Sequence, residues 1–305
     1  MRALVIGGSG FIGSHLVDGL LARSMEVRVC DRAPERFRDT PADVDFRQCD
    51  LNDTANLAEA LQDVDIVFHL ASTTVPSTSN LDPIADISGN LIATVRLLEL
   101  MRESQVKRMV YLSSGGTVYG APETDPVAES HPTHPISSYG IVKLAIEKYL
   151  LMEQNLHGLQ PVILRASNPY GPRQGHGGVQ GVIATFLHRV ARGEDFNIWG
   201  DGSVVRDFLH ISDLVSLCVE CTQSEVVGTF NVGSGEGASI RDIIAVIEQV
   251  TGRTANASYE PGRSFDVPRI VLDTALVRAA TNWAPKTSLA DGVAETWEWV
   301  QRQTQ

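Results

Sequence analysis

Tyr139 and Lys143 have side chains that could carry out proton transfer, and they are four positions apart. On a helix, residues i and i+4 share a face, so the Lys143 ammonium would lie near the Tyr139 phenol and stabilise its phenolate. A free tyrosine has a pKa of about 10, and lowering it to about 7 requires roughly 4 kcal/mol of differential stabilisation. Lysine alone seldom supplies that much, so the pair needs a second positive charge beside it. The spacing alone is also typical of an ordinary tyrosine and lysine on an amphipathic helix.

The N-terminal run suggests where that second charge comes from. Residues 2–6 are short and apolar, and Gly7, Gly10 and Gly13 then open the apolar-periodic segment 11–23. Strand, tight turn and helix in this order predict a dinucleotide-binding motif, because glycines let backbone amides approach a pyrophosphate. The oxidised nicotinamide ring of such a dinucleotide would carry the positive charge that Tyr139 needs.

Asp31 indicates which dinucleotide is bound. It follows a second apolar strand, residues 26–30, and comes eighteen residues after Gly13. An acidic side chain at this place would bond both ribose hydroxyls and repel a 2′-phosphate, which favours NAD over NADP. Arg32 and Arg36 follow directly and weaken that preference.

Length and charge restrict the class of protein. A chain of 305 residues with 43% hydrophobic content can bury a large core, and no segment is long and apolar enough to span a membrane. Because the first residues already belong to a strand, no signal peptide is expected and the protein is predicted to be cytoplasmic. With 25 basic and 37 acidic residues the formal charge is -12, which disfavours a general nucleic-acid binder. An anionic ligand would need locally placed arginines.

The four cysteines do not predict a metal site. Cys218 and Cys221 have the spacing of a metal or redox pair, but they lie in the apolar-periodic run 213–221 without a second pair. Buried helix cysteines are the better interpretation. Cys30 and Cys49 are predicted to be small strand residues, and a cytoplasmic location makes a disulfide unexpected.

Apolar runs of strand and helix length alternate along the chain. Further strands are expected over residues 44–48, 65–69, 108–112 and 161–164, and further helices over 54–61, over 85–103 and around Tyr139. This order predicts an α/β fold, a doubly wound parallel sheet of the Rossmann type, with ligands at the carboxyl ends of its strands. Residues 1–165, with a return of about 204–232, would form the NAD-binding domain. Residues 166–305 would mainly form a smaller α/β substrate lobe.

The sequence resembles the extended short-chain dehydrogenase/reductases, and within them the nucleotide-sugar epimerases and dehydratases, over nearly the whole chain. The resemblance is carried by Gly7-Gly-Ser-Gly-Phe-Ile-Gly13, Asp50-Leu51, His69-Leu-Ala71, Ser113-Ser-Gly-Gly-Thr-Val-Tyr-Gly120, Tyr139 with Lys143, Asn168-Pro-Tyr-Gly-Pro172 and Gly200-Asp-Gly-Ser-Val-Val-Arg-Asp-Phe208. The cofactor residues that it implies are Gly7, Gly10, Phe11, Ile12, Gly13, Asp31, Arg32, Asp50, Leu51, Leu70, Ala71, Tyr139 and Lys143. Asn90 would support the active-site helix, while Asn168, Arg206 and Arg263 would hold the pyrophosphate of a nucleotide sugar. The resemblance also implies a homodimer through helices near residues 85–103 and 139–155.

The residues after Ser113 and Ser114 narrow the reaction. Family dehydratases and decarboxylases carry an acidic residue or pair there, whereas this chain has Gly115 and Gly116. Without a positioned base to remove a C5 proton, C4 epimerisation of a UDP-hexose is the better interpretation. Tyr139 would take the proton of the sugar 4-hydroxyl while C4 hydride passes to NAD and later returns to the other face. The alternatives are a UDP-glucuronate 4-epimerase, a 4-keto nucleotide-sugar reductase and a redox-silent NAD-binding regulator.

Many epimerases have Ser or Thr at the position of Gly115, and its hydroxyl links the sugar hydroxyl to the tyrosine. In this chain another residue must supply that hydroxyl. In an extended segment residues two apart face the same side, so Thr117 is the preferred substitute and Ser114 the second. Sugar choice is expected to involve Asp266 and Ile270. By the same resemblance, Ile270 falls where a bulky tyrosine crowds the C2 substituent in glucose-restricted members. The pocket would then admit UDP-N-acetylglucosamine as well as UDP-glucose, the primary expectation.

Overall fold

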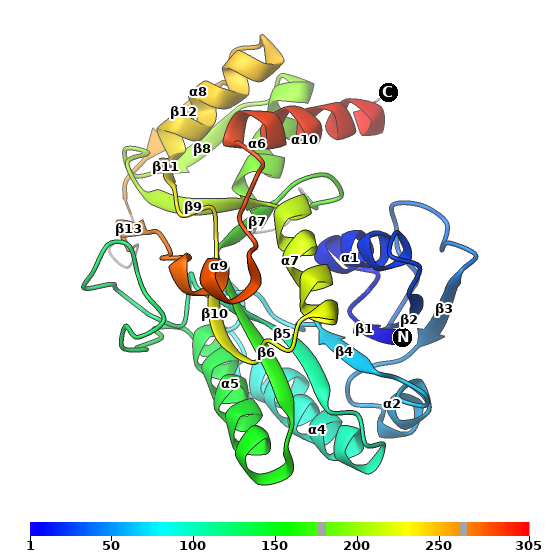
Figure 1. Cartoon of the computed structure of the whole chain (residues 1–305). Helices are drawn as coiled ribbons and strands as arrows, with labels where there is room; N and C mark the ends of the chain where they lie inside the picture. The colour runs from blue at the N-terminus through cyan, green and yellow to red at the C-terminus, as the bar shows by residue number, and fades with distance from the viewer. Residues whose placement is uncertain (176–180, 263–266, 305) are drawn as a thin grey trace. The chain divides into compact units, whose positions relative to one another are not determined.

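The computed structural model describes residues 1–175, 181–262 and 267–304, and the chain divides into two compact units (Figure 1). The first unit consists of Met1–Tyr119, Thr133–Arg165 and Val215–Phe230, and the second of Gly120–Pro132, Ala166–Leu214 and Asn231–Gln305. The return to the first unit is thus shorter than the predicted 204–232. The sequence also gave no sign that residues 120–132 group with the second unit.

Within residues 1–175 and 181–262, seven strands form one sheet in the order β10-β6-β5-β4-β1-β2-β3. They are β1 Arg2–Ile6, β2 Glu26–Asp31, β3 Val44–Gln48, β4 Ile66–His69, β5 Arg108–Ser114, β6 Gln160–Ala166 and β10 Gly228–Val232. β1 pairs in parallel with β2 and with β4, so the strand order reverses at β1. The predicted doubly wound sheet is confirmed, and a ligand site is expected at this switch point.

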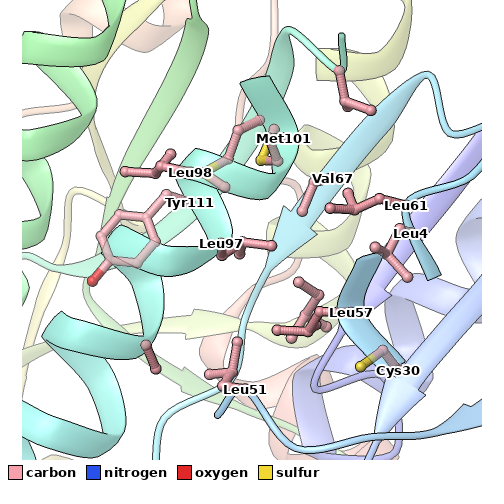
Figure 2. Close-up of a cluster of buried hydrophobic side chains, with 14 of the residues drawn as sticks. Leu4, Cys30, Leu51, Leu57, Leu61, Val67, Leu97, Leu98, Met101 and Tyr111 are labelled. Carbon is pink, nitrogen blue, oxygen red and sulfur yellow. The ribbon is translucent and has the colours of Figure 1, made fainter. Parts of the chain in front are cut away.

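Helices cover both faces of this sheet (Figure 1). They are α1 Phe11–Leu21, α2 Thr54–Ala60, α4 Ala93–Glu103, α5 Ser138–His157 and α7 Ile211–Gln223. The short helix α3, Pro83–Asp86, contacts α5. Figure 2 shows the core on one face, where Leu57 and Leu61 of the α2 segment and Leu97, Leu98 and Met101 of α4 pack over Leu4 and Val67 of the sheet. On the other face α1 contacts α7, and a Cβ on Gly19 would lie 2.7 Å from Val215 Cγ1.

α7 is fastened to the sheet by one arginine. The guanidinium of Arg108, the first residue of β5, donates to the carbonyls of Cys221 at 2.7 Å, Thr222 at 3.2 Å and Ser224 at 2.5 Å. These carbonyls lie at the C-terminal end of α7, where backbone carbonyls lack partners within a helix. The arginine supplies hydrogen-bond donors to them.

The predicted helix over 85–103 is interrupted in the structure. α3 is followed by the π-helix η1, Ile87–Ile92, before α4 begins. π-Helical turns are rare and occur mostly at functional sites. The Thr94 hydroxyl donates to the Asn90 carbonyl at 2.6 Å, which supplies a partner where the backbone pattern changes.

The second unit has sheets and helices of its own. Its elements are β7 Asn168–Tyr170, α6 Val182–Arg192, β8 Phe196–Trp199, β9 Val205–His210, β11 Gly237–Ser239, α8 Ile240–Thr251, β12 Ala257–Glu260, β13 Arg269–Ile270, α9 Ala275–Thr281 and α10 Leu289–Thr304. β9 pairs with β7, β11 and β13, while β8 pairs with β12. α6, α8 and α10 contribute to one core, in which the Phe186 and Phe196 rings stack 4.3 Å apart.

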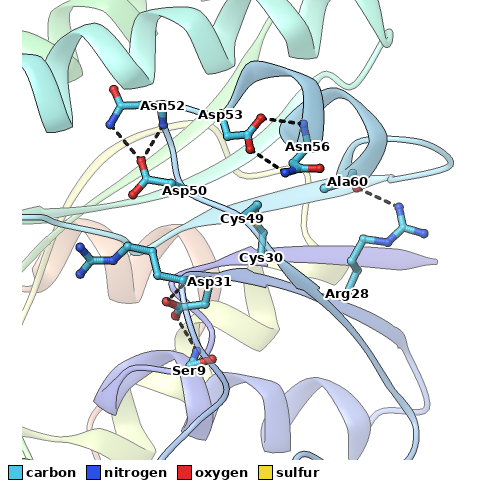
Figure 3. Close-up of a disulfide and its surroundings, with 11 residues drawn as sticks. Ser9, Arg28, Cys30, Asp31, Cys49, Asp50, Asn52, Asp53, Asn56 and Ala60 are labelled. Atoms are coloured by element: carbon cyan, nitrogen blue, oxygen red, sulfur yellow. Dashed lines mark hydrogen bonds between the residues drawn. A yellow bond between two sulfur atoms is a disulfide. The ribbon is translucent and has the colours of Figure 1, made fainter.

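The expectation that Cys30 and Cys49 are unbonded is wrong. The structure joins them as a disulfide, with Cα atoms 5.5 Å apart, a normal separation for this bond (Figure 3). Cys30 lies in β2 and Cys49 directly follows the paired strand β3, which brings the two side chains together. Cys218 and Cys221 are free and buried in α7, and burial raises the pKa of both thiols.

Among the residues that the structure describes, no helix is long and apolar enough to cross a bilayer. No cluster of three His, Cys, Asp or Glu side chains among them is arranged to hold a metal ion.

Candidate functional site

The glycine-rich turn after β1 is too tight for side chains. Gly7 has a φ of +86°, and a Cβ there would lie 2.9 Å from the Ala71 nitrogen. A Cβ on Gly13 would lie only 2.1 Å from the Gly7 carbonyl oxygen. The turn therefore brings bare backbone to the N-terminus of α1, where Phe11 and Ile12 begin the helix. Exposed amides at a helix start suit a pyrophosphate, so the turn fits a dinucleotide.

Asp31 ends β2 beside this turn. One carboxylate oxygen accepts from the Ser9 amide at 2.9 Å and the other from the Arg32 amide at 2.7 Å. Because each carboxylate oxygen can accept more than one hydrogen bond, Asp31 keeps capacity for ribose hydroxyls. The bond to Ser9 also fixes the glycine turn relative to β2.

The other predicted cofactor residues follow neighbouring strands at the same edge. Asp50 and Leu51 come after β3, and Leu70 and Ala71 come after β4. Asp50 accepts from the Asn52 backbone amide and side-chain amide, both at 2.9 Å, and the backbone bond lowers the pKa of its carboxyl. The structure thus brings these residues together with the glycine turn in the first unit.

Tyr139 and Lys143 lie in the first two turns of α5. The Ser137 hydroxyl accepts from the Gly140 amide at 3.2 Å and caps the helix start. Both side chains line one small cavity, together with Asn90. Lys143 is buried and donates to the Leu112 carbonyl at 2.8 Å, while its Nζ lies 5.6 Å from the centroid of the Tyr139 ring.

The protein by itself does not lower the pKa of Tyr139, and the sequence analysis already required a second positive charge besides Lys143. Burial raises this pKa to about 12, and the negative charge of Asp86 adds to the rise. The physical reason is that the phenolate loses its hydration, whereas the Lys143 ammonium is directed to a backbone carbonyl. Burial also lowers the pKa of Lys143 to about 8, against the opposing charges of Glu147 and Asp86.

The segment after Ser114 is a turn, so the extended geometry assumed for Thr117 is wrong. The amides of Thr117 and Val118 donate to the Ser114 carbonyl at 3.2 and 3.1 Å, which folds the chain back directly after β5. The Thr117 hydroxyl lies 3.5 Å from the same carbonyl. Thr117, in the turn, and Ser114, the last residue of β5, remain the residues predicted to supply a hydroxyl to the sugar.

A buried ionic network contacts the residues on either side of this turn, and the sequence analysis did not predict it. Glu147 accepts from the Ser113 hydroxyl at 2.5 Å and from Arg165 at 2.7 Å, and Arg165 donates to the Tyr119 hydroxyl at 2.9 Å. The network therefore connects α5 to both ends of the turn segment. Glu147 follows Lys143 by four residues, a spacing that placed it on the same helix face and could have identified it.

Three predicted substrate residues come together in the second unit. Arg206 on β9 stands in register with Ile270 on β13. Asn168 on β7 donates from its side-chain amide to the Asp207 carbonyl at 2.8 Å, on the same strand β9. Arg263 and Asp266 lie outside the described residues. Ile270 is 5% exposed, so it packs mainly against its neighbours.

Comparisons with known proteins place this geometry in a family. Residues 3–233 match the model of the NAD dependent epimerase/dehydratase family. The UDP-glucose 4-epimerase of Mycolicibacterium smegmatis is 37% identical over 315 residues, covering 100% of both chains. The structure of UDP-glucose 4-epimerase with UDP-glucose from Thermotoga maritima has a TM-score of 0.95 and 33% identity, again covering 100% of both chains. That of the Thermus thermophilus UDP-glucose 4-epimerase complex with NAD has a TM-score of 0.92 and 35% identity, covering 99% of both.

The family match covers more than half of the chain, and the identities exceed 30% over its full length. The glycine turn, Asp31 and the Tyr139–Lys143 pair all fall within the matched residues. The chain therefore belongs to the NAD-dependent epimerase/dehydratase family.

Proposed function

We propose that this protein is an NAD-dependent 4-epimerase of UDP-hexoses that interconverts UDP-glucose and UDP-galactose. The observation that carries the proposal is that half-buried Tyr139 and buried Lys143 line one cavity of the unit that also contains the dinucleotide turn. Full-length similarity to enzymes named UDP-glucose 4-epimerase narrows the reaction. Gly115 and Gly116 agree with it, because they stand where eliminating relatives would need an acid.

The cofactor residues have separate tasks. The amides of the turn around Gly7, Gly10 and Gly13 would hold the pyrophosphate, and Asp31 the adenosine ribose. When bound, NAD supplies a hydride acceptor that later returns the hydride, and its oxidised ring adds positive charge beside the phenol.

Cofactor identity can be tested without sugar turnover. Acid-denatured protein should release NAD or NADH, and Asp31→Ala should weaken binding of NAD more than binding of NADP. Retention of NADP by the wild-type protein would overturn the assignment.

Tyr139 performs the proton transfers in this proposal. Its phenolate accepts the proton of the 4-hydroxyl as the C4 hydride leaves, and the phenol returns a proton to that oxygen after the 4-keto sugar has turned over. The Lys143 ammonium stabilises the phenolate. Thr117 or Ser114 would bond the same sugar hydroxyl and orient it toward Tyr139.

Asn168 and Arg206 would hold the UDP pyrophosphate, with Arg263 and Asp266 completing the site. Guanidinium groups suit this task because they form paired, charge-assisted bonds to phosphate oxygens. Ile270 would border the C2 substituent of the sugar.

We also propose that the protein is a homodimer through an apolar stripe on α5. Ile141, Tyr149, Met152 and Leu156 recur at helical spacing on this helix, and all are exposed, Leu156 by 66%. Exposed apolar residues gathered on one helix face are typical of an interface. Leu156→Glu should shift the protein toward monomer in sedimentation experiments. Leu276→Glu, which changes an exposed leucine of α9 in the second unit, should not.

The proposed location is the cytoplasm. Cys218 and Cys221 are free, as in a reducing compartment. The Cys30–Cys49 disulfide would have to withstand cytoplasmic reductants there. Mass spectrometry of protein extracted from cells with its thiols blocked would show whether Cys30 and Cys49 are bonded in the cell.

A panel of UDP-sugars with product identification tests the reaction itself. UDP-glucose should equilibrate with UDP-galactose without net consumption of external NADH. Turnover of UDP-glucuronate alone would favour the glucuronate 4-epimerase, and stoichiometric consumption of NADH or NADPH with a 4-keto sugar would favour a reductase. Absence of any turnover would favour an NAD-binding regulator.

A further inference from the structure

Asp86, the last residue of α3, is a buried carboxyl group beside the predicted catalytic pair. Its exposed fraction is 0%, and it lines the same small cavity as Tyr139 and Lys143. Burying an ionised carboxylate is costly unless hydrogen bonds or charges compensate it. Its neighbours therefore indicate what it does there.

Three neutral groups donate to Asp86. One carboxylate oxygen accepts from the Thr74 hydroxyl at 2.6 Å and from the Asn90 side-chain amide at 2.9 Å. The other accepts from the Ser138 hydroxyl at 2.6 Å. These bonds reach both oxygens, so they satisfy the buried carboxyl group on each side.

The bond to Ser138 has a direct structural consequence. Ser138 is the first residue of α5 and immediately precedes Tyr139, so Asp86 fastens the start of that helix to η1. The same α5 terminus is held by Asn80, whose side chain accepts from the Ser138 amide at 2.8 Å. The Tyr139 amide donates to the Ser79 hydroxyl at 3.1 Å.

Among the described cavity residues, Asp86 is the carboxylate that faces the pair, and the other titratable groups nearby are neutral or ion-paired. Burial lowers the pKa of His69 to about 3 and raises that of Tyr111 well above its usual value, so both are neutral at pH 7. Glu147 is neutralised by Arg165, 2.7 Å away. Glu147 raises the pKa of Lys143 more than Asp86 does, and Asp86 is the second anion that raises it.

We propose that Asp86 is a positioning residue that fastens Tyr139 through Ser138 and, as a buried anion in the cavity of Tyr139 and Lys143, shifts the pH range of the reaction. This rests on the proposed epimerase function. The electrostatic effect has a definite sign: an anion at this place makes both Tyr139 and Lys143 hold their protons to higher pH. Asp86 thus opposes loss of the Lys143 charge, which burial favours.

Asp86→Asn keeps the size of the side chain and removes its negative charge. The acidic limb of the pH profile of kcat/KM, assigned to Tyr139, and the basic limb, assigned to Lys143, should both move to lower pH by about one unit, since one pKa unit is a typical effect of a single nearby charge. Ser138→Ala is the matched control, which removes the anchoring bond and keeps the anion. It should lower kcat without moving the limbs. A profile for Asp86→Asn that coincides with wild type would overturn the proposal, whatever happens to kcat.

A second measurement does not depend on sugar turnover. Ultraviolet absorbance of tyrosinate in the NAD-loaded protein, taken as the difference from Tyr139→Phe, reports the ionisation of Tyr139 directly. This ionisation should occur at lower pH in Asp86→Asn than in wild type, and an unchanged titration would also overturn the proposal. If wild type converts no UDP-sugar, the epimerase assignment fails while this titration still decides the role of Asp86. Asp86→Ser serves the same purpose if Asp86→Asn does not fold.

Discussion

Tyr139 is a phenol whose burial opposes the ionised form that its proposed role requires. The residue is useful as a base only while positive charge surrounds it, from Lys143 and from the oxidised cofactor. The lysine lies 5.6 Å from the ring centroid and donates to a backbone carbonyl, so its effect is through space. Catalysis at this residue is therefore expected to depend on cofactor state as well as on pH.

Tyr139→Phe should reduce turnover by about 10²-fold to 10⁴-fold, because it removes the proton acceptor and preserves the ring. Steady-state assays on UDP-glucose measure the loss, and the thermal unfolding midpoint should stay near that of wild type. Tyr259→Phe, a change at an exposed position of β12, is the control and should retain activity. Turnover by Tyr139→Phe within a few-fold of wild type would identify another group as the base.

The hydroxyl that replaces the one missing at Gly115 remains a prediction. We expect Thr117→Val to lower kcat more than Ser114→Ala, since Thr117 lies in the turn that contains Gly115 and Ser114 still belongs to β5. Parallel kinetics of the two variants decide between the residues. Equal losses, or a larger loss for Ser114→Ala, would reject Thr117.

At the residue scale, spacing identified Tyr139 and Lys143 because i and i+4 positions are fixed by helix geometry. It could not identify Asp86, whose partners Thr74 and Ser138 are 12 and 52 residues away in the sequence. The geometry of Thr117 was misjudged because glycines permit a turn as readily as an extended strand.

The strands were the elements that sequence predicted best. β1 and β3 have the predicted bounds, Arg2–Ile6 and Val44–Gln48, because short apolar runs between turn residues have few other stable arrangements. The π-helix Ile87–Ile92 was missed, since a local change from one helical hydrogen-bond pattern to another has no hydrophobic period of its own.

The disulfide joins two neighbouring elements, and its stability effect can be estimated. Cys30 and Cys49 are 19 residues apart, and closing a loop of this size stabilises a protein by about 3 kcal/mol. Adding reductant should therefore lower the thermal unfolding midpoint of wild type. Cys30→Ala/Cys49→Ala should start from the lower value and show no response. A wild-type midpoint that is insensitive to complete reduction would contradict the estimate.

The short strand β13 places Ile270 beside Arg206, and sugar choice is predicted at this pair of strands. Ile270→Tyr should depress kcat/KM for UDP-N-acetylglucosamine while sparing UDP-glucose, because the larger ring fills space near C2. Ile270→Val is the control for general disturbance of the packing and should change both sugars equally. An unchanged ratio of the two specificity constants in Ile270→Tyr would reject the assignment.

At the scale of the whole molecule, the sequence suggested a return over about 204–232, and the first unit includes Val215–Phe230. That return supplies β10 at the end of the sheet and the α7 carbonyls bound by Arg108. Long-range pairing of this kind depends on tertiary contacts, which local periodicity does not encode.

A chain ending at Arg165 should therefore fold poorly. It would leave the edge of β6 unpaired and the Arg108 guanidinium without the carbonyls of Cys221, Thr222 and Ser224. We expect fragment 1–165 to unfold at lower denaturant concentration than fragment 1–232, with circular dichroism as the measurement. Equal midpoints would show that the return adds no stability.

The late arrival of β10 also has a consequence during synthesis on the ribosome. After Arg165 is made, about 67 more residues must follow before Val232 completes the sheet, roughly 3 to 13 s at 5–20 residues per second. For that interval the nascent chain carries an open strand edge, the kind of surface that pairs with other chains. Slow translation between these two points would lengthen this exposure, so the protein is expected to rely on chaperones while it is being made.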